Sequence, residues 1–182
     1  LNSKNIIVAT GARPRSIPPL PLDQERIITS RESILLEELP KSIVIVGGGA
    51  IGVEFAYLYK MYGVEVTVVE LLPHLVPNED EDISRQLERS FAKQRINVIT
   101  GAGVTGVNQR LDGLTVKLDK DGVEQSVECD KVLAAIGIQP NSEGLGLEEL
   151  SVETQGGYIQ IDGQMSTNVR GIYAIGDVTG KL

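Results

Sequence analysis

The sequence predicts an α/β fold built on a doubly wound parallel sheet, and three observations support this prediction. The 182-residue chain contains 20 glycines and many valines and isoleucines, a composition typical of buried strands joined by tight turns. Short apolar runs alternate with segments of helical spacing. Most clearly, a buried run at residues 43–46, a glycine turn, a helical stretch at residues 50–62 and a second strand at residues 64–69 form one βαβ unit.

The first forty residues predict a strand, an extended linker and a helix. Residues 5–9 are an apolar run that stops at a Thr-Gly pair, and residues 13–22 are rich in proline, which favours extended backbone. Apolar residues recur at helical spacing over residues 30–39. Because Pro40 follows, we expect this helix to end before the proline.

The second half of the chain predicts strands of two kinds. Residues 80–94 are expected to form a helix because acidic residues occupy its first turn, and residues 97–100 follow as a third parallel strand in the spatial order 3-2-1. Alternating polar and apolar residues with Asp-Gly turn signals then predict an antiparallel β-meander as the crossover. Its strands are expected at residues 104–109, 114–118 and 123–127. Further strands are expected at residues 132–136, which return to the parallel sheet, and at residues 158–161 and 172–174.

Charge and composition exclude several classes of partner. The net charge of −8 at pH 7 offers no cluster of Lys and Arg for nucleic acid or an anionic membrane. No stretch approaches the roughly 20 apolar residues of a membrane span. The single cysteine, Cys129, can form neither an internal disulfide nor a multi-thiolate metal site, so we expect a reducing, cytoplasmic compartment, no metal, and small molecules as ligands.

The glycine turn carries the chemistry of dinucleotide binding. Gly47, Gly49 and Gly52 form a G-x-G-x-x-G pattern between a strand and a helix, the context in which a Rossmann-like domain uses it. The first glycine permits the tight turn, the second lets a pyrophosphate approach the backbone, and the third lets the helix pack closely. Ala50 and Ile51 lie in the first helical turn, whose free N–H groups and positive dipole end favour phosphate. The alternative is a glycine-rich turn that serves packing only.

Glu70 ends the second strand of the βαβ unit, about 20 residues beyond the glycines. From this position a carboxylate accepts hydrogen bonds from the adenosine ribose hydroxyls and repels a 2′-phosphate. Leu71, Leu72 and Pro73 follow, so no arginine stands ready to receive such a phosphate. The pattern therefore favours NAD(H) over NADP(H), the alternative being a solvated glutamate at a strand end.

Three other side chains receive ordinary structural interpretations. Glu54 is a first-turn acid of the helix, favoured there by the dipole. His74, the only histidine, lies in a proline-flanked loop. Cys129 has no histidine partner and is interpreted as a small packing residue. We therefore expect no catalytic residue within this chain.

Motifs beyond the glycine turn extend the interpretation to most of the chain. The segments are 6–12, with its Ala-Thr-Gly; 46–56, with the glycine pattern; 132–141; and 167–177, which ends in Ile-Gly-Asp. In this order they resemble the two-dinucleotide-binding flavoprotein disulfide reductases, and within that family the branch whose members oxidise dihydrolipoamide. One departure is the sequence Gly-Ile-Gln-Pro-Asn at residues 137–141, because the family usually has an arginine after this glycine.

The resemblance implies contacts with two cofactors, NAD and FAD. For NAD it implies Glu70, Val104 beside the adenine and Gly137 near the nicotinamide. For FAD, in the intact enzyme, it implies Thr10, Gly11 and Asp177. The family places a glutamate at the position of Glu54 beside a lysine, but that lysine would precede residue 1.

The resemblance also implies how the chain is organised. Residues 1–29 are expected to be the exit strand and linker of an FAD-binding domain, residues 30–141 the NAD-binding domain, and residues 142–182 a return segment to the FAD domain. The chain starts without methionine and stops shortly after the Gly-Asp motif, so we expect a piece of a longer protein. The family implies a homodimer and, for this branch, a 2-oxoacid dehydrogenase complex as partner.

The family's redox centre is a C-x-x-x-x-C pair with a His-Glu acid/base couple, and the chain has neither. The chain is therefore expected to bind NAD but to be inactive alone. Alternatives within the same fold are an NADH oxidase or peroxidase, or a mercuric or glutathione reductase, although Glu70 disfavours the NADPH users. A non-catalytic dinucleotide-binding module, such as a redox-sensing regulator, is a further alternative that would call for a basic DNA-binding element.

Overall fold

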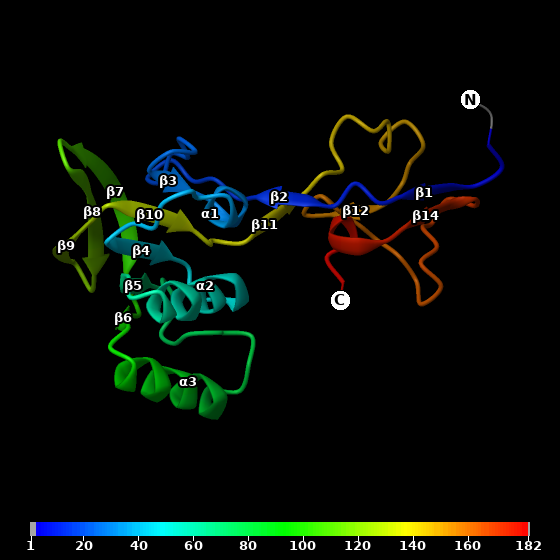
Figure 1. Ribbon diagram of the computed structural model, residues 1–182. Helices are drawn as coiled ribbons and strands as arrows, with labels where there is room; N and C mark the ends of the chain where they lie inside the picture. Colours follow the sequence, from blue (N-terminus) through cyan, green and yellow to red (C-terminus); the bar gives the residue numbers. More distant parts are fainter. Residues whose placement is uncertain (1–2, 182) are drawn as a thin grey trace. The chain divides into compact units, whose positions relative to one another are not determined.

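The computed structural model describes residues 3–181, which form two compact units. One unit is Pro14–Gly137, and the other combines the residues up to Arg13 with those from Ile138 onward. The labels of Figure 1 are used below for the elements of each unit.

The Pro14–Gly137 unit is built on a parallel sheet of five strands in the order β3-β10-β4-β5-β6. Register is continuous across its centre, where Val44 of β4 lies between Val132 of β10 and Thr67 of β5. The central strands β4 and β10 are buried over most of their length, which explains their largely apolar sequences. The strands are β3 (Ile27–Ile28), β4 (Ser42–Val46), β5 (Glu65–Val69), β6 (Asn97–Ile99) and β10 (Lys131–Ala134).

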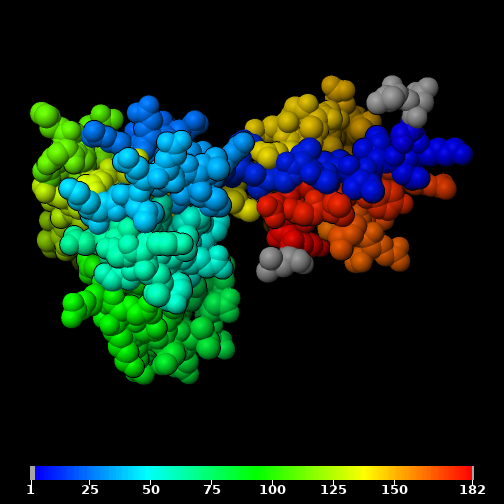
Figure 2. All heavy atoms as spheres, viewed as in Figure 1, coloured from blue at the N-terminus to red at the C-terminus, as the bar shows by residue number. Residues whose placement is uncertain are grey.

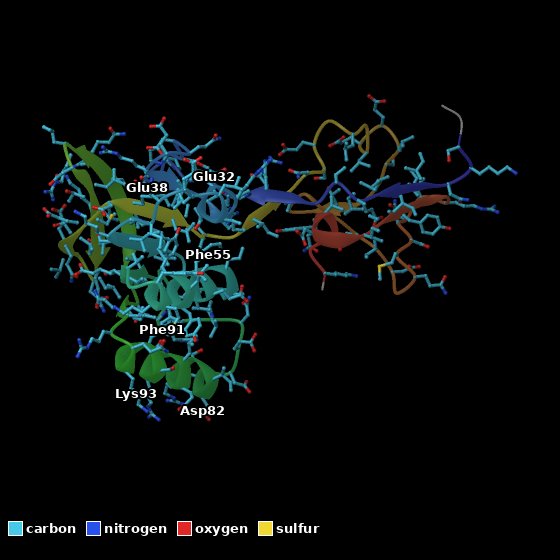
Figure 3. The ribbon with its side chains drawn as sticks, in the orientation of Figure 1. Glu32, Glu38, Phe55, Asp82, Phe91 and Lys93 are labelled. Carbon is cyan, nitrogen blue, oxygen red and sulfur yellow. The ribbon has the colours of Figure 1, made fainter. Side chains whose placement is uncertain are left out.

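Helices cover one face of this sheet. They are α1 (Ser30–Ile34), α2 (Ala50–Met61) and α3 (Glu81–Lys93). Tyr59 of α2 and Phe91 of α3 are buried in one apolar cluster with Ile45 and Val68 of the sheet, and the spheres of α2 and α3 adjoin in Figure 2. The charged ends of α3, with Asp82 in the first turn and Lys93 in the last, project away from the sheet and complement the helix dipole (Figure 3).

An antiparallel meander covers the other face of the sheet. It consists of β7 (Gly103–Arg110), β8 (Gly113–Lys120) and β9 (Val123–Cys129) in consecutive order. Leu114, Val116 and Leu118 of β8 are fully buried against alternate residues of the parallel sheet, such as Val44. The predicted α/β class, the 3-2-1 strand order and the meander are therefore confirmed.

The start of this unit differs from the expectation in two respects. The helix predicted over residues 30–39 ends at Ile34, and Ile34 and Leu35 are 74% and 73% exposed, so their apolar spacing does not mark a buried face. Thr29 and Glu32 form a capping box that fixes where the short helix begins. Residues 14–29, expected to be a linker, belong to this unit because Leu20 is fully buried and β3 pairs with β10.

The second unit is made of short two-stranded pairings around a small apolar cluster that includes Val8, Ile159 and Ala174. β1 (Ile6–Val8) pairs with β14 (Ile172–Ala174) in parallel, and β12 (Thr154–Gln155) pairs with β13 (Tyr158–Ile159) in an antiparallel hairpin. β2 (Ala12–Pro14) pairs with β11 (Ile138–Pro140), and the 3₁₀ turn η1 spans Gly176–Thr179. The unit begins again at Ile138, whereas the sequence suggested a boundary after residue 141.

Between residues 3 and 181, no helix has the length and apolar character needed to cross a membrane.

Candidate functional site

The predicted glycine turn lies at the carboxyl end of β4 and leads into α2. Gly47 has φ +107, and a Cβ built there would lie 2.2 Å from the carbonyl oxygen of Ala135, which follows β10. The Gly47 N–H donates to the Val69 carbonyl at 2.8 Å, which ties the turn to β5. Glycine is thus required here both for the left-handed backbone and for the close approach of a neighbouring segment.

Gly52 lets α2 pack directly on the turn. A Cβ at this position would lie 1.9 Å from the Gly47 carbonyl oxygen and 3.5 Å from Cγ2 of Ile45. Gly52 is buried, and its backbone lies in the helix. The third glycine of the pattern therefore serves close helix–strand packing, as its position in the motif predicts.

Gly49 differs because it borders open space. Among residues 3–181, no atom outside Gly49 and its two chain neighbours lies within 4 Å of a Cβ built on Gly49. Gly49 is the N-cap of α2, and its carbonyl accepts the first helical bond, from Val53 N–H at 3.0 Å. No side chain caps this helix end in the described structure, and Ala50 and Ile51 are exposed. The arrangement can receive an anion at the helix N-terminus.

Glu70 lies at the end of β5 with only 7% of its surface exposed. One carboxylate oxygen accepts the N–H of Gly48 at 2.5 Å and the other accepts the N–H of Leu72 at 2.7 Å. The carboxylate therefore fixes the glycine turn, a role that its position in the sequence did not indicate. A carboxylate offers about four acceptor sites, so the two bonds leave capacity for ligand hydroxyls.

Gly48 is a constrained residue that the sequence reasoning missed. A Cβ there would lie 2.5 Å from Cδ2 of Leu75 and 3.2 Å from Cβ of Glu70. The run Gly47-Gly48-Gly49 was the available signal, but the G-x-G-x-x-G motif assigns roles to Gly47 and Gly49 and none to Gly48. The side chain that requires the middle glycine comes from a loop 27 positions away in the chain, a contact that no local pattern reveals.

Val104 and Gly137, which the resemblance associates with NAD, lie near the glycine turn through short backbone links. The N–H of Ala102, two residues before Val104, donates to the Glu70 carbonyl at 3.0 Å. Ala135, which crowds Gly47, precedes Gly137 by two residues. Val104 is half-buried in β7, and Gly137 is exposed with φ +99.

A cavity of the Pro14–Gly137 unit lies away from the glycine turn. Its volume is about 450 Å³, and it is lined by residues at the amino ends of β4 and β10, among them Pro40 and Lys131. The glycine turn follows the carboxyl end of β4, at the opposite edge of the sheet. Ligands of doubly wound sheets bind outside the carboxyl ends, so we assign the candidate site to the glycine turn and not to this cavity.

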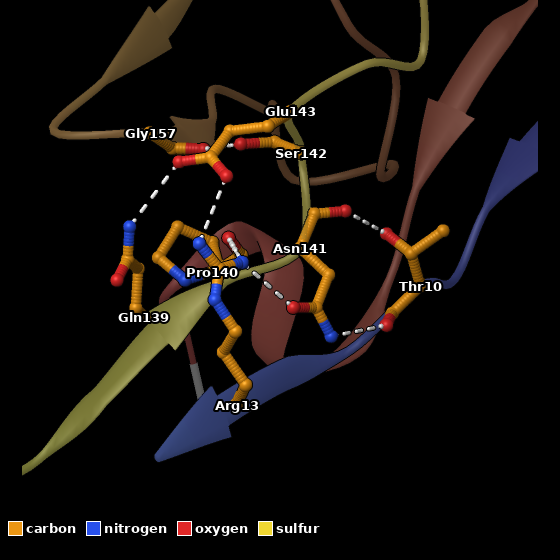
Figure 4. Close-up of polar contacts among 8 residues, drawn as sticks. All are labelled: Thr10, Arg13, Gln139, Pro140, Asn141, Ser142, Glu143 and Gly157. Atoms are coloured by element: carbon orange, nitrogen blue, oxygen red, sulfur yellow. Dashed lines mark hydrogen bonds and ion pairs between the residues drawn. The ribbon is translucent and has the colours of Figure 1, made fainter. Parts of the chain in front are cut away.

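The residues associated with FAD lie in the second unit. Thr10 Oγ1 donates to the Asn141 carbonyl at 2.6 Å, and Asn141 Nδ2 donates to the Thr10 carbonyl at 3.0 Å (Figure 4). The Asn141 N–H donates to the Gly11 carbonyl at 3.0 Å. Gly11 has φ +68. Asp177 is exposed in the first turn of η1. Thr10, Gly11 and Asp177 are not joined to one another by any hydrogen bond.

Arg13 occupies the region where the departure from the family pattern was noted. Its guanidinium donates to Asn141 Oδ1 at 3.0 Å and forms an ion pair with Glu143 at 2.8 Å (Figure 4). Gln139 donates to the same carboxylate at 3.2 Å. This pair is largely exposed, so its contribution to stability is small, but it helps to fix the Thr10–Asn141 contact.

Comparison with known proteins identifies the family. The family model for pyridine nucleotide-disulphide oxidoreductases matches residues 1–182. The chain belongs to this family. Dihydrolipoyl dehydrogenase of Mycobacterium leprae is 49% identical over 179 residues, which are 98% of this chain and 38% of that protein. The chain thus spans well under half the length of this curated relative.

Two solved structures have the same fold as this chain. The crystal structure of LpdA from Mycobacterium tuberculosis has a TM-score of 0.87 and 40% identity, covering 97% of this chain and 38% of that one. The HOCl-induced flavoprotein disulfide reductase RclA from Escherichia coli has a TM-score of 0.83 and 30% identity, covering 98% of this chain and 40% of that one. Both resemblances extend over both units of the chain.

In a family whose name refers to disulphide chemistry, Cys129 is the thiol to examine. It is buried at the end of β9, and burial raises the pKa of the thiol to about 11. The thiolate is the reactive form, so a folded chain keeps this sulfur unreactive near neutral pH. The structure agrees with the interpretation of Cys129 as a packing residue. Between residues 3 and 181, no group of three or more His, Cys, Asp or Glu side chains is placed to hold a metal ion.

We therefore expect Cys129 to resist alkylation in the folded chain. With a pKa of about 11, only about one thiol in a thousand is ionised at pH 8, and burial further hinders access. Iodoacetamide at pH 8 should leave the folded protein unmodified for hours and should modify it within minutes in denaturant, as followed by mass spectrometry. Rapid modification of the folded chain would contradict the buried position of this sulfur.

Proposed function

We propose that the Pro14–Gly137 unit binds NAD(H), and that the chain is part of an enzyme that oxidises dihydrolipoamide. The observation on which this proposal depends is the open space at Gly49, in front of an uncapped helix end and beside the carboxylate of Glu70. These are the features that a pyrophosphate and an adenosine ribose require. Identity of 49% to a dihydrolipoyl dehydrogenase over 98% of the chain supports the substrate class.

In this proposal the residues of the unit bind and orient the dinucleotide, and none makes or breaks a bond. The amides of Gly49, Ala50 and Ile51 would donate to the pyrophosphate at the positive end of α2. Glu70 would accept hydrogen bonds from the ribose hydroxyls with the acceptor capacity that the glycine turn leaves free. Bound nicotinamide would supply the hydride acceptor or donor.

The remaining assignments follow from the family resemblance and belong to the same proposal. Val104 would lie beside the adenine and Gly137 near the nicotinamide. Thr10, Gly11 and Asp177 would contact FAD in the intact enzyme. We also propose a homodimer, as the family implies, with a 2-oxoacid dehydrogenase complex as the larger assembly.

A second candidate is a disulfide reductase or oxidase of the same family with another substrate. The observation that supports this second candidate is the similarity to RclA, which is 30% identical over 98% of the chain. Dihydrolipoamide, or the other substrate of the second candidate, would react at a redox disulfide. A chain with one cysteine cannot form this disulfide by itself. Substrate assays on the enzyme that contains this chain would separate the two candidates, and NADH binding by the chain is common to both.

The proposal predicts that the chain binds NADH at least about ten-fold more tightly than NADPH. The buried carboxylate of Glu70 would repel a 2′-phosphate and would lose its ribose hydrogen bond. Glu70→Gln removes the charge but keeps one acceptor for the turn, so it should narrow the preference to about two-fold. Glu70→Ala should narrow the preference for NADH as well. It should also weaken the binding of both cofactors, because the Gly48 and Leu72 amides lose their acceptor.

Isothermal titration calorimetry with both cofactors measures these changes. Glu65→Gln is the matched control, because Glu65 begins the same strand and is exposed. The control should keep the full preference. Equal affinity of the unaltered chain for NADH and NADPH would refute the role of Glu70 in cofactor choice.

We also expect the 182-residue polypeptide, purified alone, to be colourless and inactive in dihydrolipoamide:NAD reduction. Two electrons from a dithiol must pass through a disulfide, and the chain has one cysteine, whose sulfur is buried. The visible spectrum, with and without added FAD, and a coupled NADH assay measure both properties. Stoichiometric bound flavin or measurable turnover would refute this expectation, whereas NADH binding in the same preparation would show that the polypeptide is folded.

A further inference from the structure

The loop of residues 71–79, between β5 and α3, is attached to the glycine turn by contacts that the dinucleotide motif does not include. Val76 donates its N–H to the Gly48 carbonyl at 2.8 Å. The side chain of Leu75 is fully buried, and it occupies the space that a Cβ on Gly48 would fill. The loop therefore packs directly on the middle residue of the turn.

Gly48 is held on both sides as a result. Glu70 accepts its N–H, and Val76 donates to its carbonyl. In a trans peptide the C=O and the N–H point in opposite directions. The bond from Val76 thus fixes the plane of the peptide between Gly48 and Gly49, and it directs the Gly49 N–H away from the loop. Gly49 is the residue that borders open space at the helix end.

The backbone of Val76 is strained in the conformation that makes this bond. Its φ is +43, in the left-handed region that β-branched residues rarely adopt. Such a conformation persists only where the surroundings enforce it. The burial of Leu75 is one such constraint. The other is Glu88 of α3, whose carboxylate Oε1 accepts the Leu75 N–H at 3.1 Å.

We propose that Glu88, Leu75 and Val76 form a latch that presets the Gly49 amide for the pyrophosphate of the dinucleotide. Glu88 is then a positioning residue, since it acts through the loop and through Gly48. The inference rests on the proposed binding of NAD(H) at the glycine turn. It adds a contribution from α3, an element outside the βαβ unit that carries the motif.

The test compares three variants of the full chain. Glu88→Ala removes the acceptor of the Leu75 N–H. Glu88→Gln retains a side-chain oxygen that can accept it. Glu81→Ala is the matched control, because Glu81 lies on the same helix and its side chain is engaged in an exposed ion pair with Arg85. Calorimetry or fluorescence titration gives the affinities for NADH, ADP-ribose and adenosine, and a thermal melt checks the fold.

Glu88→Ala should weaken the binding of NADH and of ADP-ribose about five- to twenty-fold. This is the effect expected when one hydrogen bond to the pyrophosphate, from the Gly49 amide, is no longer well placed. Adenosine, which lacks the pyrophosphate, should change by less than about two-fold. Glu88→Gln should recover most of the lost affinity, and Glu81→Ala should bind as the unaltered chain does. An equal loss for adenosine, or no loss for NADH, would overturn the latch.

Hydrogen exchange provides a measurement that does not require a folded Glu88→Ala variant. If the latch and the dinucleotide stabilise the same orientation of the turn, NADH must slow exchange of residues 71–79 in the unaltered chain, because coupling between two sites is reciprocal. Unchanged exchange at saturating NADH would overturn the latch. Absence of NADH binding by the unaltered chain would instead refute the proposed function.

Discussion

Gly52→Ala should destabilise the Pro14–Gly137 unit by about 3 kcal/mol or more and lower its Tm by about 6–12 °C. The new methyl group would lie 1.9 Å from the Gly47 carbonyl oxygen and 3.0 Å from the Gly47 carbonyl carbon. These are backbone atoms, so no side-chain rotation relieves the overlap. Either α2 must move away from β4 or the glycine turn must deform.

The sign of this effect opposes helix propensity. Alanine is favoured over glycine in a helix interior by about 1 kcal/mol, so an open helical site would become more stable on substitution. Gly106→Ala, in strand β7, is a control for an added methyl group without overlap, because no described atom outside Gly106 and its two chain neighbours lies within 4 Å of its Cβ position. Calorimetric melts of both variants measure the difference. A Gly52→Ala variant as stable as the control would mean that the helix and the turn are not packed as described.

The elements that could be predicted from sequence are those with strong local signals. The run at residues 43–46 is continuously apolar and buried, and the run at residues 64–69 is rich in valine. The two runs flank a glycine turn that has few other uses. The meander was predictable because Asp-Gly pairs end its strands. In each case the residues within one short segment determine its conformation.

Where prediction failed, the deciding partner lay far away in the chain. β3 has two residues, too few for a pattern, and exists because it pairs with β10 more than a hundred positions later. The helix from Ser30 ends early although the leucines that follow continue the helical spacing. Periodicity counts apolar residues but does not show what covers them, and Leu35 is largely exposed.

The candidate site shows the same division. Gly47, Gly49 and Gly52 could be found from their spacing. The structure gives a steric reason for glycine at Gly47 and at Gly52, whereas Gly49 borders open space. The attachment of Glu70 to the turn could not be found in this way, nor could the Glu88 contact with Leu75, because both depend on how loops return to the sheet. Sequence motifs locate the groups that face a ligand better than the groups that hold them in place.

Gly49→Val should weaken NADH binding by at least about a hundred-fold and leave the fold intact. Gly49 adopts φ −75 and ψ −173, an extended conformation that valine accepts, and no described atom outside Gly49 and its two chain neighbours lies within 4 Å of its Cβ position. The side chain would therefore enter the space through which a pyrophosphate must approach the backbone. Loss of glycine at the N-cap costs only a few tenths of a kcal/mol to about 1 kcal/mol.

A graded series makes this expectation quantitative. Gly49→Ala adds one methyl group and should weaken NADH binding about ten-fold. Gly49→Val adds two more carbons and should remove measurable NADH binding. Both variants should melt within about 3 °C of the unaltered chain, in contrast to Gly52→Ala. Calorimetric titration with NADH and thermal melts of the same samples measure both quantities. Full NADH affinity in Gly49→Val, with a normal melt, would mean that the glycine turn serves packing alone, because a dinucleotide held elsewhere would not sense a side chain that points into this space.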